Sequence, residues 1–289
     1  MGLVRLPRKF PLLPRKKRTD KSDYGHVLVL AGSKGLSGAA KLASRAALVS
    51  GSGLVTLGVP QSLEGLMARA LTEVMPLGLP ETKGGALSPS AYGKIAGFIK
   101  KRKINALAVG PGLSQDVRTG SLVRKLVKNA VVPVVLDADG LNSFRKRVSL
   151  LRGRKTSLVL TPHQREFERL FGKPWPENED ARIRLAKKLS RFYDVVLLLK
   201  GHRTLVVHGD RVYVNKTGNP GMAKGGTGDV LTGIIASFIA QGLDPFSAAV
   251  WAVTVHGRAG DAAAKVKGQL GLVASDLIDH LPGVLKSLE

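Results

Sequence analysis

The chain has 289 residues, of which 44% are hydrophobic, and its 45 lysines and arginines against 21 acidic residues give a formal net charge of +24. It contains no cysteine, which excludes a disulfide framework, a thiolate metal site and a cysteine nucleophile. No apolar run is long enough to span a bilayer, and the N-terminus lacks the apolar stretch of a secretory signal. We therefore expect a soluble, cytoplasmic protein without membrane partners.

The charge excess is compatible with nucleic-acid binding. However, aromatic residues make up only 5% of the chain, so few side chains could stack on single-stranded bases. The basic residues are also spread along the sequence, apart from one cluster near its start. We expect no specific nucleic-acid partner, and anionic substrates or a general compositional bias explain the charge equally well.

The basic cluster lies between positions 5 and 21 and contains prolines at positions 7, 11 and 14. It predicts that residues 1–25 form an extended basic arm, which either lies across a neighbouring subunit or is a disordered tail. The basic residues are Arg5, Arg8, Lys9, Arg15, Lys16, Lys17, Arg18 and Lys21.

From residue 26 onward, short apolar runs alternate with helical patterns, which predicts a mostly parallel sheet covered on both faces by helices. We expect a single α/β domain over residues 26–289. The predicted strands are 26–31, 54–59, 104–109, 131–136, 157–161, 195–200, 204–208 and 211–214. The predicted helices are 37–50, 89–101, 115–129, 162–171, 177–192, 227–241, 245–265 and 274–285. Gly209-Asp210 predicts an antiparallel hairpin between the last two strands.

Glycine-rich or polar turns follow five of these strands, and they begin at Gly32, Gly110, Asp137, Thr161 and Lys200. Because ligands bind outside the carboxyl ends of strands in open α/β sheets, we expect the five turns to surround one crevice. This convergence is the strongest indication of an enzyme in the sequence.

Several polar residues in these turns have two interpretations each. Asp137 or Asp139 could place Mg²⁺ through water, or could cap the helix near Gly140. Thr161 is predicted as a helix N-cap with Pro162 at the first helical position, which leaves His163 free to donate to a phosphate or to remain a surface histidine. Lys200 could meet a phosphate or be solvated. No histidine spacing predicts a zinc site, and we expect residues 256–261 to serve packing.

A glycine-rich segment, residues 215–233, runs directly into a predicted amphipathic helix. Its glycines let the backbone close around an anion, and the unpaired amides and dipole of the helix N-terminus attract one. Asp229 lies in the first turn of this helix. Because a carboxylate repels phosphate, we interpret Asp229 as a base that takes a proton from an attacking hydroxyl. Complementing the helix dipole is the alternative role.

The string 225–229, Gly-Gly-Thr-Gly-Asp, resembles the anion-hole signature of the ribokinase-like kinases. The longer segment 215–233 is similar to that of the ADP/ATP-dependent NAD(P)HX dehydratases, the nicotinamide-repair branch of that superfamily. Further similar motifs occur in the expected order at residues 21–33, 37–48, 50–56, 110–113, 136–142, 161–166 and 200–204.

The resemblance implies a ribokinase-like three-layer α/β/α fold and a lyase that repairs hydrated NADH or NADPH, with ADP or ATP as co-substrate, Mg²⁺ as cofactor and a homo-oligomeric assembly. It implies that Ala39, Gly112, His163 and Asp229 face the hydrated nicotinamide. The implied nucleotide-binding residues are Lys200, Gly201, His202, Arg203, Thr204, Asn215, Gly225, Gly226, Thr227 and Gly228.

In the implied reaction Asp229 deprotonates the ring hydroxyl, whose oxygen attacks the terminal phosphoryl group, and loss of the phosphate restores NAD(P)H. Residues 1–25 are too short for the epimerase domain of the fused family members, so we expect no epimerase activity. Residues 34–36 differ from the family pattern, which leaves the substrate contact near Ser33 undefined. The choice between ADP and ATP stays open, although microbial relatives favour ADP.

Two other functions remain open. A ribokinase-like kinase of a vitamin precursor or sugar would use the same Asp229 but leave the phosphate on its product. A nucleic-acid-binding protein would bind duplexes with a steep salt dependence and turn over no nucleotide.

Overall fold

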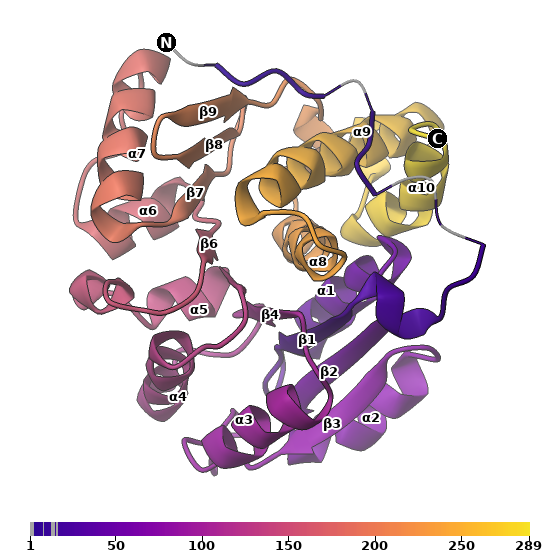
Figure 1. Cartoon of the computed structure of the whole chain (residues 1–289), viewed down its shortest axis with the longest axis vertical. Helices are drawn as coiled ribbons and strands as arrows, with labels where there is room; N and C mark the ends of the chain where they lie inside the picture. The colour runs from indigo at the N-terminus through magenta and orange to yellow at the C-terminus, as the bar shows by residue number, and fades with distance from the viewer. Residues whose placement is uncertain (1–2, 8, 13–14, 16) are drawn as a thin grey trace.

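The structure is a computed structural model that describes residues 3–7, 9–12, 15 and 17–289 (Figure 1). Within this part of the chain one nine-stranded sheet has the order β3-β2-β1-β4-β5-β6-β7-β8-β9. Neighbours from β3 to β7 pair in parallel, and β7, β8 and β9 pair antiparallel. The strands are β1 His26–Leu30, β2 Leu54–Pro60, β3 Met75–Leu79, β4 Ala106–Val109, β5 Val134–Leu136, β6 Leu158–Leu160, β7 Val196–Leu199, β8 Leu205–His208 and β9 Arg211–Val214. The mostly parallel sheet and the terminal hairpin are confirmed.

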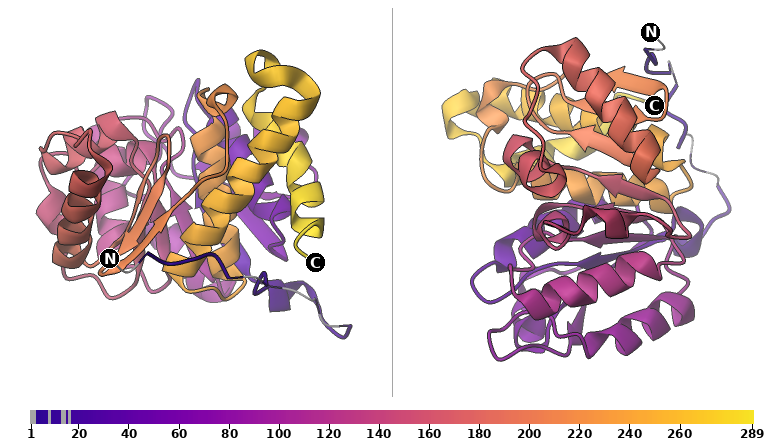
Figure 2. Two further views of the ribbon diagram at one scale, coloured as in Figure 1. Left: turned by 90° about the horizontal axis from the view of Figure 1, so that it is seen from above. Right: turned by 90° about the vertical axis from the view of Figure 1, so that its left-hand side faces the viewer.

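Two helix layers cover the sheet (Figure 2). The core on one face includes residues of α1, α2, α8, α9 and α10, and the core on the other face includes residues of α3 to α7. The helices are α1 Ser37–Val49, α2 Glu64–Ala70, α3 Ala91–Lys101, α4 Val117–Lys128, α5 Ala138–Asn142, α6 Gln164–Phe171, α7 Glu179–Tyr193, α8 Thr227–Ala240, α9 Pro245–Gly271 and α10 Ala274–Lys286. Short 3-10 helices occupy Lys21–Tyr24, Gln61–Leu63, Val148–Leu151 and Pro220–Met222. This arrangement confirms the three-layer α/β/α fold.

Strand β1 shows why its sequence is apolar throughout. Val27 and Val29 point into one core, and Leu28 and Leu30 point into the other. Successive side chains of a strand alternate between faces, so a strand covered on both sides needs an apolar residue at every position.

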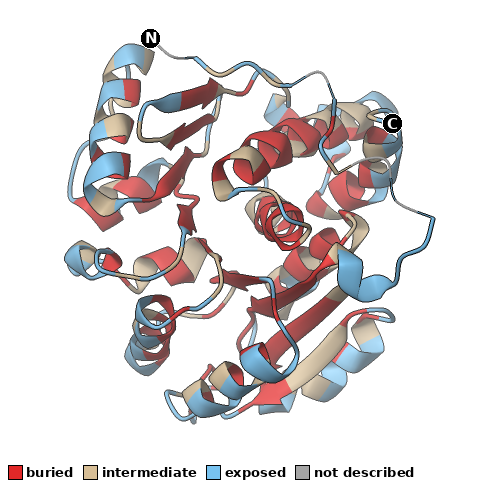
Figure 3. Ribbon diagram, viewed as in Figure 1, coloured by how far each residue is buried: buried red, intermediate tan, exposed pale blue. Residues whose placement is uncertain are grey.

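Helix α8 lies in the middle of its layer and is buried on all sides from residue 230 to 240 (Figure 3). It packs on α1 and α9 and over β1, β4 and β5. The crossing with α1 is so close that a Cβ on Gly233 would lie 2.1 Å from the carbonyl oxygen of Ala43. The packing therefore fixes the N-terminus of α8 over the ends of the central strands.

The sequence analysis missed β3 and α2, and it began α3, α4, α6 and α7 two residues too early. Pro76 and Gly78 lie in β3, and both residue types are disfavoured in strands, so this edge strand carried no signal. Helix α6 begins at Gln164 with His163 as its N-cap. The predicted capping role of Thr161 and helical position of Pro162 were therefore wrong.

The described part of the expected basic arm packs against its own chain and is not a free tail. Leu3 forms a parallel bridge with Val212. The ring of Phe10 is buried, with its centroid 5.3 Å from that of Phe238 and 4.9 Å from that of Trp251. The predictions for Arg8 and Lys16 and the proline at position 14 lie outside the described residues. No helix within the described ranges is both long and apolar enough to cross a bilayer.

Candidate active site

The turns that follow the central strands meet at one edge of the sheet, as predicted. Each is joined to its neighbour by a backbone hydrogen bond: Gly32 N to Pro111 O at 2.8 Å, Gly110 N to Leu30 O at 3.2 Å, Asp137 N to Val109 O at 3.1 Å, Thr161 N to Leu136 O at 3.2 Å and Lys200 N to Pro162 O at 3.0 Å. The chain runs outward from β1 through β2 to β3 and then returns to β4 on the other side of β1. A reversal of strand order of this kind is where ligands bind in open α/β sheets.

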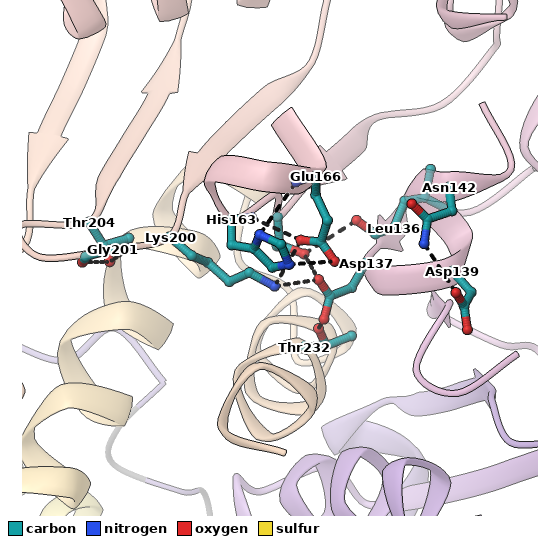
Figure 4. A network of polar contacts seen from close by, with 11 residues as sticks. Leu136, Asp137, Asp139, Asn142, His163, Glu166, Lys200, Gly201, Thr204 and Thr232 are labelled. Carbon is teal, nitrogen blue, oxygen red and sulfur yellow. Dashed lines mark hydrogen bonds and ion pairs between the residues drawn. The ribbon is translucent and has the colours of Figure 1, made fainter. Parts of the chain in front are cut away.

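Asp137 is the most buried charged group of this edge, with 1% of its surface exposed. Its Oδ1 accepts hydrogen bonds from Lys200 Nζ and Thr161 Oγ1, both at 2.7 Å, and its Oδ2 accepts one from Thr232 Oγ1 at 2.7 Å (Figure 4). The side chain makes no capping bond to α5, so the capping role that we left open is wrong. The carboxylate instead ties β5, β6, β7 and α8 together.

Glu166 forms a second buried carboxylate beside Lys200. Its Oε2 accepts a hydrogen bond from His163 N at 2.9 Å and lies 3.6 Å from Lys200 Nζ, and its Oε1 lies 3.4 Å from His163 Nε2. Burial lowers the pKa of His163, and the charge of Lys200 lowers it further although Glu166 opposes this. The imidazole is therefore neutral near pH 7.

Lys200 is an ion-pair partner within this cluster and not a solvated lysine. Burial lowers the pKa of its amine, but the charges of Asp137, Glu166 and Asp229 outweigh burial and raise the pKa above the ordinary value. The group is thus positively charged near neutral pH.

Asp229 lies in the first turn of α8, as predicted. Burial and, after it, the charges of Asp137 and Glu166 raise the pKa of its carboxyl to about 7, although the charge of Lys200 opposes the shift. A general base works best when its pKa is close to the working pH, and an ordinary aspartate is too weak. The surroundings of Asp229 therefore suit proton abstraction better than they suit a role as a helix-dipole partner.

A cavity of about 530 Å³ opens beside this cluster. Of the predicted nucleotide-binding residues, Lys200, Gly201, His202, Arg203, Thr204, Asn215, Thr227 and Gly228 line it. Its remaining lining includes Thr217, Gly218, Asn219 and Met222 of the glycine-rich segment. Two segments that are distant in sequence thus line one cavity.

The backbone at the start of α8 requires glycine at position 226 and leaves limited room for a side chain at position 228. Gly226, the N-cap, has a φ of 93°, in the left-handed region that side chains disfavour. A Cβ on Gly228 would lie 3.3 Å from Lys200 Nζ and 3.8 Å from Asp137 Oδ2. Gly225 and Gly226 are absent from the described lining of the cavity.

The residues predicted for the substrate separate into two places. Gly112 and Ala39 are neighbours, since a Cβ on Gly112 would lie 3.1 Å from that of Ala39, and Ser33 Oγ donates to Gly112 O at 2.8 Å. His163 and Asp229 lie instead around Lys200. None of Ala39, Gly112, His163 and Asp229 belongs to the described lining of the nucleotide-side cavity.

The sequence analysis missed the contribution of α9, where it expected packing alone. His256 lines the cavity and its Nε2 donates to Thr227 O at 2.9 Å; burial lowers its pKa to about 4, which keeps the ring neutral. Asp261 accepts hydrogen bonds from Gly218 N at 2.9 Å and from Asn219 Nδ2 at 3.0 Å. The available signal was a pair of glycines, at 257 and 260, inside a helical pattern.

Those two glycines let the loop lie directly on α9. A Cβ on Gly257 would lie 2.1 Å from Thr217 Oγ1, and one on Gly260 would lie 2.2 Å from the sulfur of Met222. The glycine-rich segment therefore packs directly against α9, which also packs in the core.

The acidic residues of the site fit a water-mediated cation better than direct coordination. Among the described residues no three histidine or acidic side chains form a group that could hold a metal ion. Asp137 already accepts three hydrogen bonds, whereas Asp139 is half-buried and accepts one, from Asn142 Nδ2 at 3.1 Å. Mg²⁺ usually keeps several waters and binds few carboxylates, so of the two aspartates predicted for it Asp139 is the better candidate.

Comparison with known proteins identifies the family. A family model described as NAD(P)H-hydrate dehydratase matches residues 27–283. The bifunctional NAD(P)H-hydrate repair enzyme Nnr of Moorella thermoacetica is 47% identical over 279 residues, which are 96% of this chain and 52% of that protein. The ADP-dependent (S)-NAD(P)H-hydrate dehydratase of Xanthomonas campestris is 36% identical, over 93% of this chain and 91% of its own.

A solved structure agrees. The ADP/ATP-dependent NAD(P)H-hydrate dehydratase from Bacillus subtilis, co-crystallised with ATP and Mg²⁺, has a TM-score of 0.83 and 33% identity, and the match covers 97% of this chain and 95% of that one. The chain spans about half the length of the bifunctional curated relatives that it matches. On the family model, the sequence identities and the shared fold, this chain belongs to the NAD(P)H-hydrate dehydratase family.

Proposed function

We propose that the protein is an ADP- or ATP-dependent (S)-NAD(P)H-hydrate dehydratase, a hydro-lyase that restores NADH or NADPH from the hydrated dinucleotide. The observation that carries this proposal is Asp229: a carboxyl group with its pKa raised to about 7 in the first turn of α8, next to a cavity of about 530 Å³. The names of the Xanthomonas campestris and Bacillus subtilis relatives supply the substrate and the choice of ADP or ATP.

In this proposal the nucleotide occupies the cavity between residues 200–204 and the glycine-rich segment. Backbone amides at the N-terminus of α8 face the phosphate end of the nucleotide, where the helix dipole favours negative charge. Lys200 stays charged and lies next to Gly228, so its amine can offset the charge that develops on the transferred phosphoryl group. Gly226, with its left-handed φ of 93°, lets the loop turn into the helix.

The hydrated nicotinamide lies on the other side of Asp229, against Ala39, Gly112 and His163. Asp229 takes the proton of the ring hydroxyl, and the hydroxyl oxygen attacks the terminal phosphorus of the nucleotide. The bond from that phosphorus to its bridging oxygen breaks, which releases AMP from ADP or ADP from ATP. The phosphorylated ring then loses inorganic phosphate and a proton from the adjacent carbon, and the carbon–carbon double bond forms again.

The nucleotide is consumed because phosphate is a much better leaving group than hydroxide. Mg²⁺, when bound, would neutralise phosphate charge, with its waters held by Asp139. His163 is neutral near pH 7 and is held by Glu166, so it can donate a hydrogen bond to the dinucleotide without placing another positive charge beside Lys200.

The test is to incubate the protein with chemically hydrated NADH, Mg²⁺ and either ADP or ATP, and to follow the absorbance of the dihydronicotinamide. We expect its recovery to require the nucleotide and to release one inorganic phosphate per ring restored. A kinase of the same fold would consume nucleotide but retain phosphate on its product, so a phosphorylated ring that accumulates without NADH would contradict the proposal.

We also propose that residues 26–289 form one catalytic domain and that the enzyme is a cytoplasmic homo-oligomer. The continuous sheet from β3 to β9 supports the single domain. Light scattering on the purified chain measures the assembly, and a mass equal to one chain would contradict the oligomer.

A further inference from the structure

A second cavity, of about 370 Å³, lies at the opposite edge of the sheet from the candidate active site. Leu158 and Val196, which begin β6 and β7, line it, whereas the catalytic cluster follows the ends of those strands. Its other walls include the β8–β9 hairpin, through His208 and Arg211, and the start of α9. The two cavities share no lining residue.

Arg154 is the unusual residue of this second cavity. Its side chain is only 4% exposed. Nη1 donates to Tyr193 O at 2.8 Å and to Leu151 O at 2.5 Å. Nε and Nη2, however, have no hydrogen-bond partner within the described part of the chain. The nearest carboxylate oxygen, of Asp194, is 3.6 Å from Nη2 and belongs to a side chain that is 89% exposed.

Buried donors without acceptors are costly, and native proteins rarely leave them unsatisfied. Thr156, which also lines the cavity, adds a third such atom, its Oγ1. Burial lowers the pKa of the Arg154 guanidinium, although the charge of Asp194 acts to raise it. A buried cation shows such a lowered pKa when no close counter-ion compensates for the loss of solvent. The three unsatisfied atoms therefore indicate a missing group that offers several acceptor oxygens.

The charges around the cavity favour an anion as that group. Lys155 is exposed and Arg211 adds a second positive charge to that of Arg154. Of the two aspartates in the lining, Asp244 is already engaged: it accepts from Ser247 N at 3.3 Å as the N-cap of α9, and it lies 3.4 Å from Arg211 Nη1. The N-terminus of this long helix contributes a further partial positive charge.

We propose that this cavity binds a small phosphate compound, of the size of pyrophosphate or a phosphate monoester. The phosphate oxygens accept hydrogen bonds from Arg154 Nε and Nη2 and from the Thr156 hydroxyl, and the exposed amine of Lys155 offsets part of the remaining charge. These three atoms are enclosed by protein in this structure, so the anion reaches them when the exposed carboxylate of Asp194, 3.6 Å from Nη2, turns toward solvent. This inference does not depend on the proposed dehydratase reaction, because it uses none of its residues.

The test is calorimetric titration of the full chain with inorganic pyrophosphate at low ionic strength, because the attraction is screened by salt. We expect two binding events, one at the α8 N-terminus and one at the second cavity. Lys155→Glu should weaken the second event at least fivefold and leave the first within twofold. Lys173→Glu is the matched control: it makes the same charge change at an exposed lysine outside both cavities, and it should change neither event.

Amide NMR spectra locate the second event directly. Pyrophosphate should shift the signals of residues 154–158 and 208–211, and parallel titrations with inorganic phosphate and ADP show whether the phosphate alone or an attached nucleoside is preferred. Arg154→Gln should also abolish the event, and Lys155→Glu decides if that variant does not fold. A single binding event in the wild type, shifts confined to the active-site cavity, or equal weakening by both lysine variants would overturn the proposal.

Discussion

Asp229 combines a reactive position with an unfavourable environment. Its carboxyl group is partly buried near Asp137 and Glu166, and these surroundings raise its pKa from 3.8 to about 7. Such a shift penalises the ionised form of the group. The same residue should therefore control both the rate of the reaction and the stability of the empty enzyme.

Replacement of Asp229 should remove the base without removing the nucleotide site. We expect Asp229→Asn to lower kcat by about 10²- to 10⁴-fold, the usual contribution of a general base, while nucleotide affinity changes little. Single-turnover kinetics and equilibrium nucleotide binding measure the two effects separately. Turnover close to that of the wild type would assign the proton transfer to another group.

The wild-type rate should depend on pH through the same carboxyl group. Only ionised Asp229 can accept a proton, so kcat/KM should rise with pH and level off above about pH 7. Lys200 keeps its charge over this range because its pKa is raised. A rate that is independent of pH between 5 and 8 would contradict the assignment.

The stability of the empty enzyme should show the opposite trend. Because the pKa of Asp229 is higher in the folded than in the unfolded protein, its favourable contribution is present below about pH 4 and is lost as the pH rises toward 7. Asp229→Asn should therefore raise the melting temperature more at pH 8 than at pH 5. The free energy of unfolding should be higher in the variant by roughly 1 to 4 kcal/mol at pH 8, because the variant has no carboxyl group whose ionisation is penalised in the folded protein. Differential scanning calorimetry of the two proteins at both pH values measures it.

At the scale of elements, α9 holds the glycine-rich segment (residues 215–233) in place. Gly257 and Gly260 allow the loop to approach the helix, and Asp261 fixes it with two hydrogen bonds, to Gly218 N and Asn219 Nδ2. Because the loop lines the cavity, its position should affect nucleotide binding more than proton transfer. Asp261 is thus a positioning residue.

We expect Asp261→Ala to raise the KM for the nucleotide about fivefold, the equivalent of about 1 kcal/mol for hydrogen bonds at a partly exposed site, with kcat within twofold. Asp279→Ala is the control, since Asp279 forms an exposed ion pair with Arg45 on the surface of α10. Initial-rate kinetics with varied nucleotide separate the two constants. An equal change in both variants, or a fall in kcat alone, would argue against the positioning role.

At the scale of the whole molecule, the described part of the N-terminal arm belongs to the core. Phe10 is 5% exposed and completes an aromatic group with Phe238 of α8 and Trp251 of α9. The arm thus packs on α8, which carries the proposed catalytic residue Asp229, and on α9, which contacts the glycine-rich segment.

Phe10→Ala should lower the free energy of unfolding by about 3 kcal/mol, as expected for a buried phenylalanine. The equivalent fall in melting temperature is about 5 to 10 °C for a protein of this size. Phe192→Ala is the matched control, because this phenylalanine is 57% exposed and should cost less than about 1 kcal/mol. Urea denaturation compares them, and equal losses would mean that the arm adds no specific stability.

The sequence determined the layers of the fold and most of the nucleotide site. Uniformly apolar strands between amphipathic helices admit little besides a covered parallel sheet. The glycine-rich segment before α8 follows local rules of backbone geometry, which a sequence displays directly, whereas the nucleotide-binding role of residues 200–204 was implied by the family resemblance. The edge strand β3 was not predicted, because its residues have low strand propensity and its strand conformation depends on pairing with β2.

Only the tertiary structure decided which charges meet. The network of Asp137, Lys200 and Thr232 joins positions that lie 63 and 95 residues from Asp137, and no local pattern encodes such distances. The raised pKa of Asp229, the support that α9 gives to the loop and the unsatisfied donors of Arg154 depend on burial and on neighbours from other elements. Electrostatic energies depend on the distance and solvation of each group, and these are fixed only when the chain has folded.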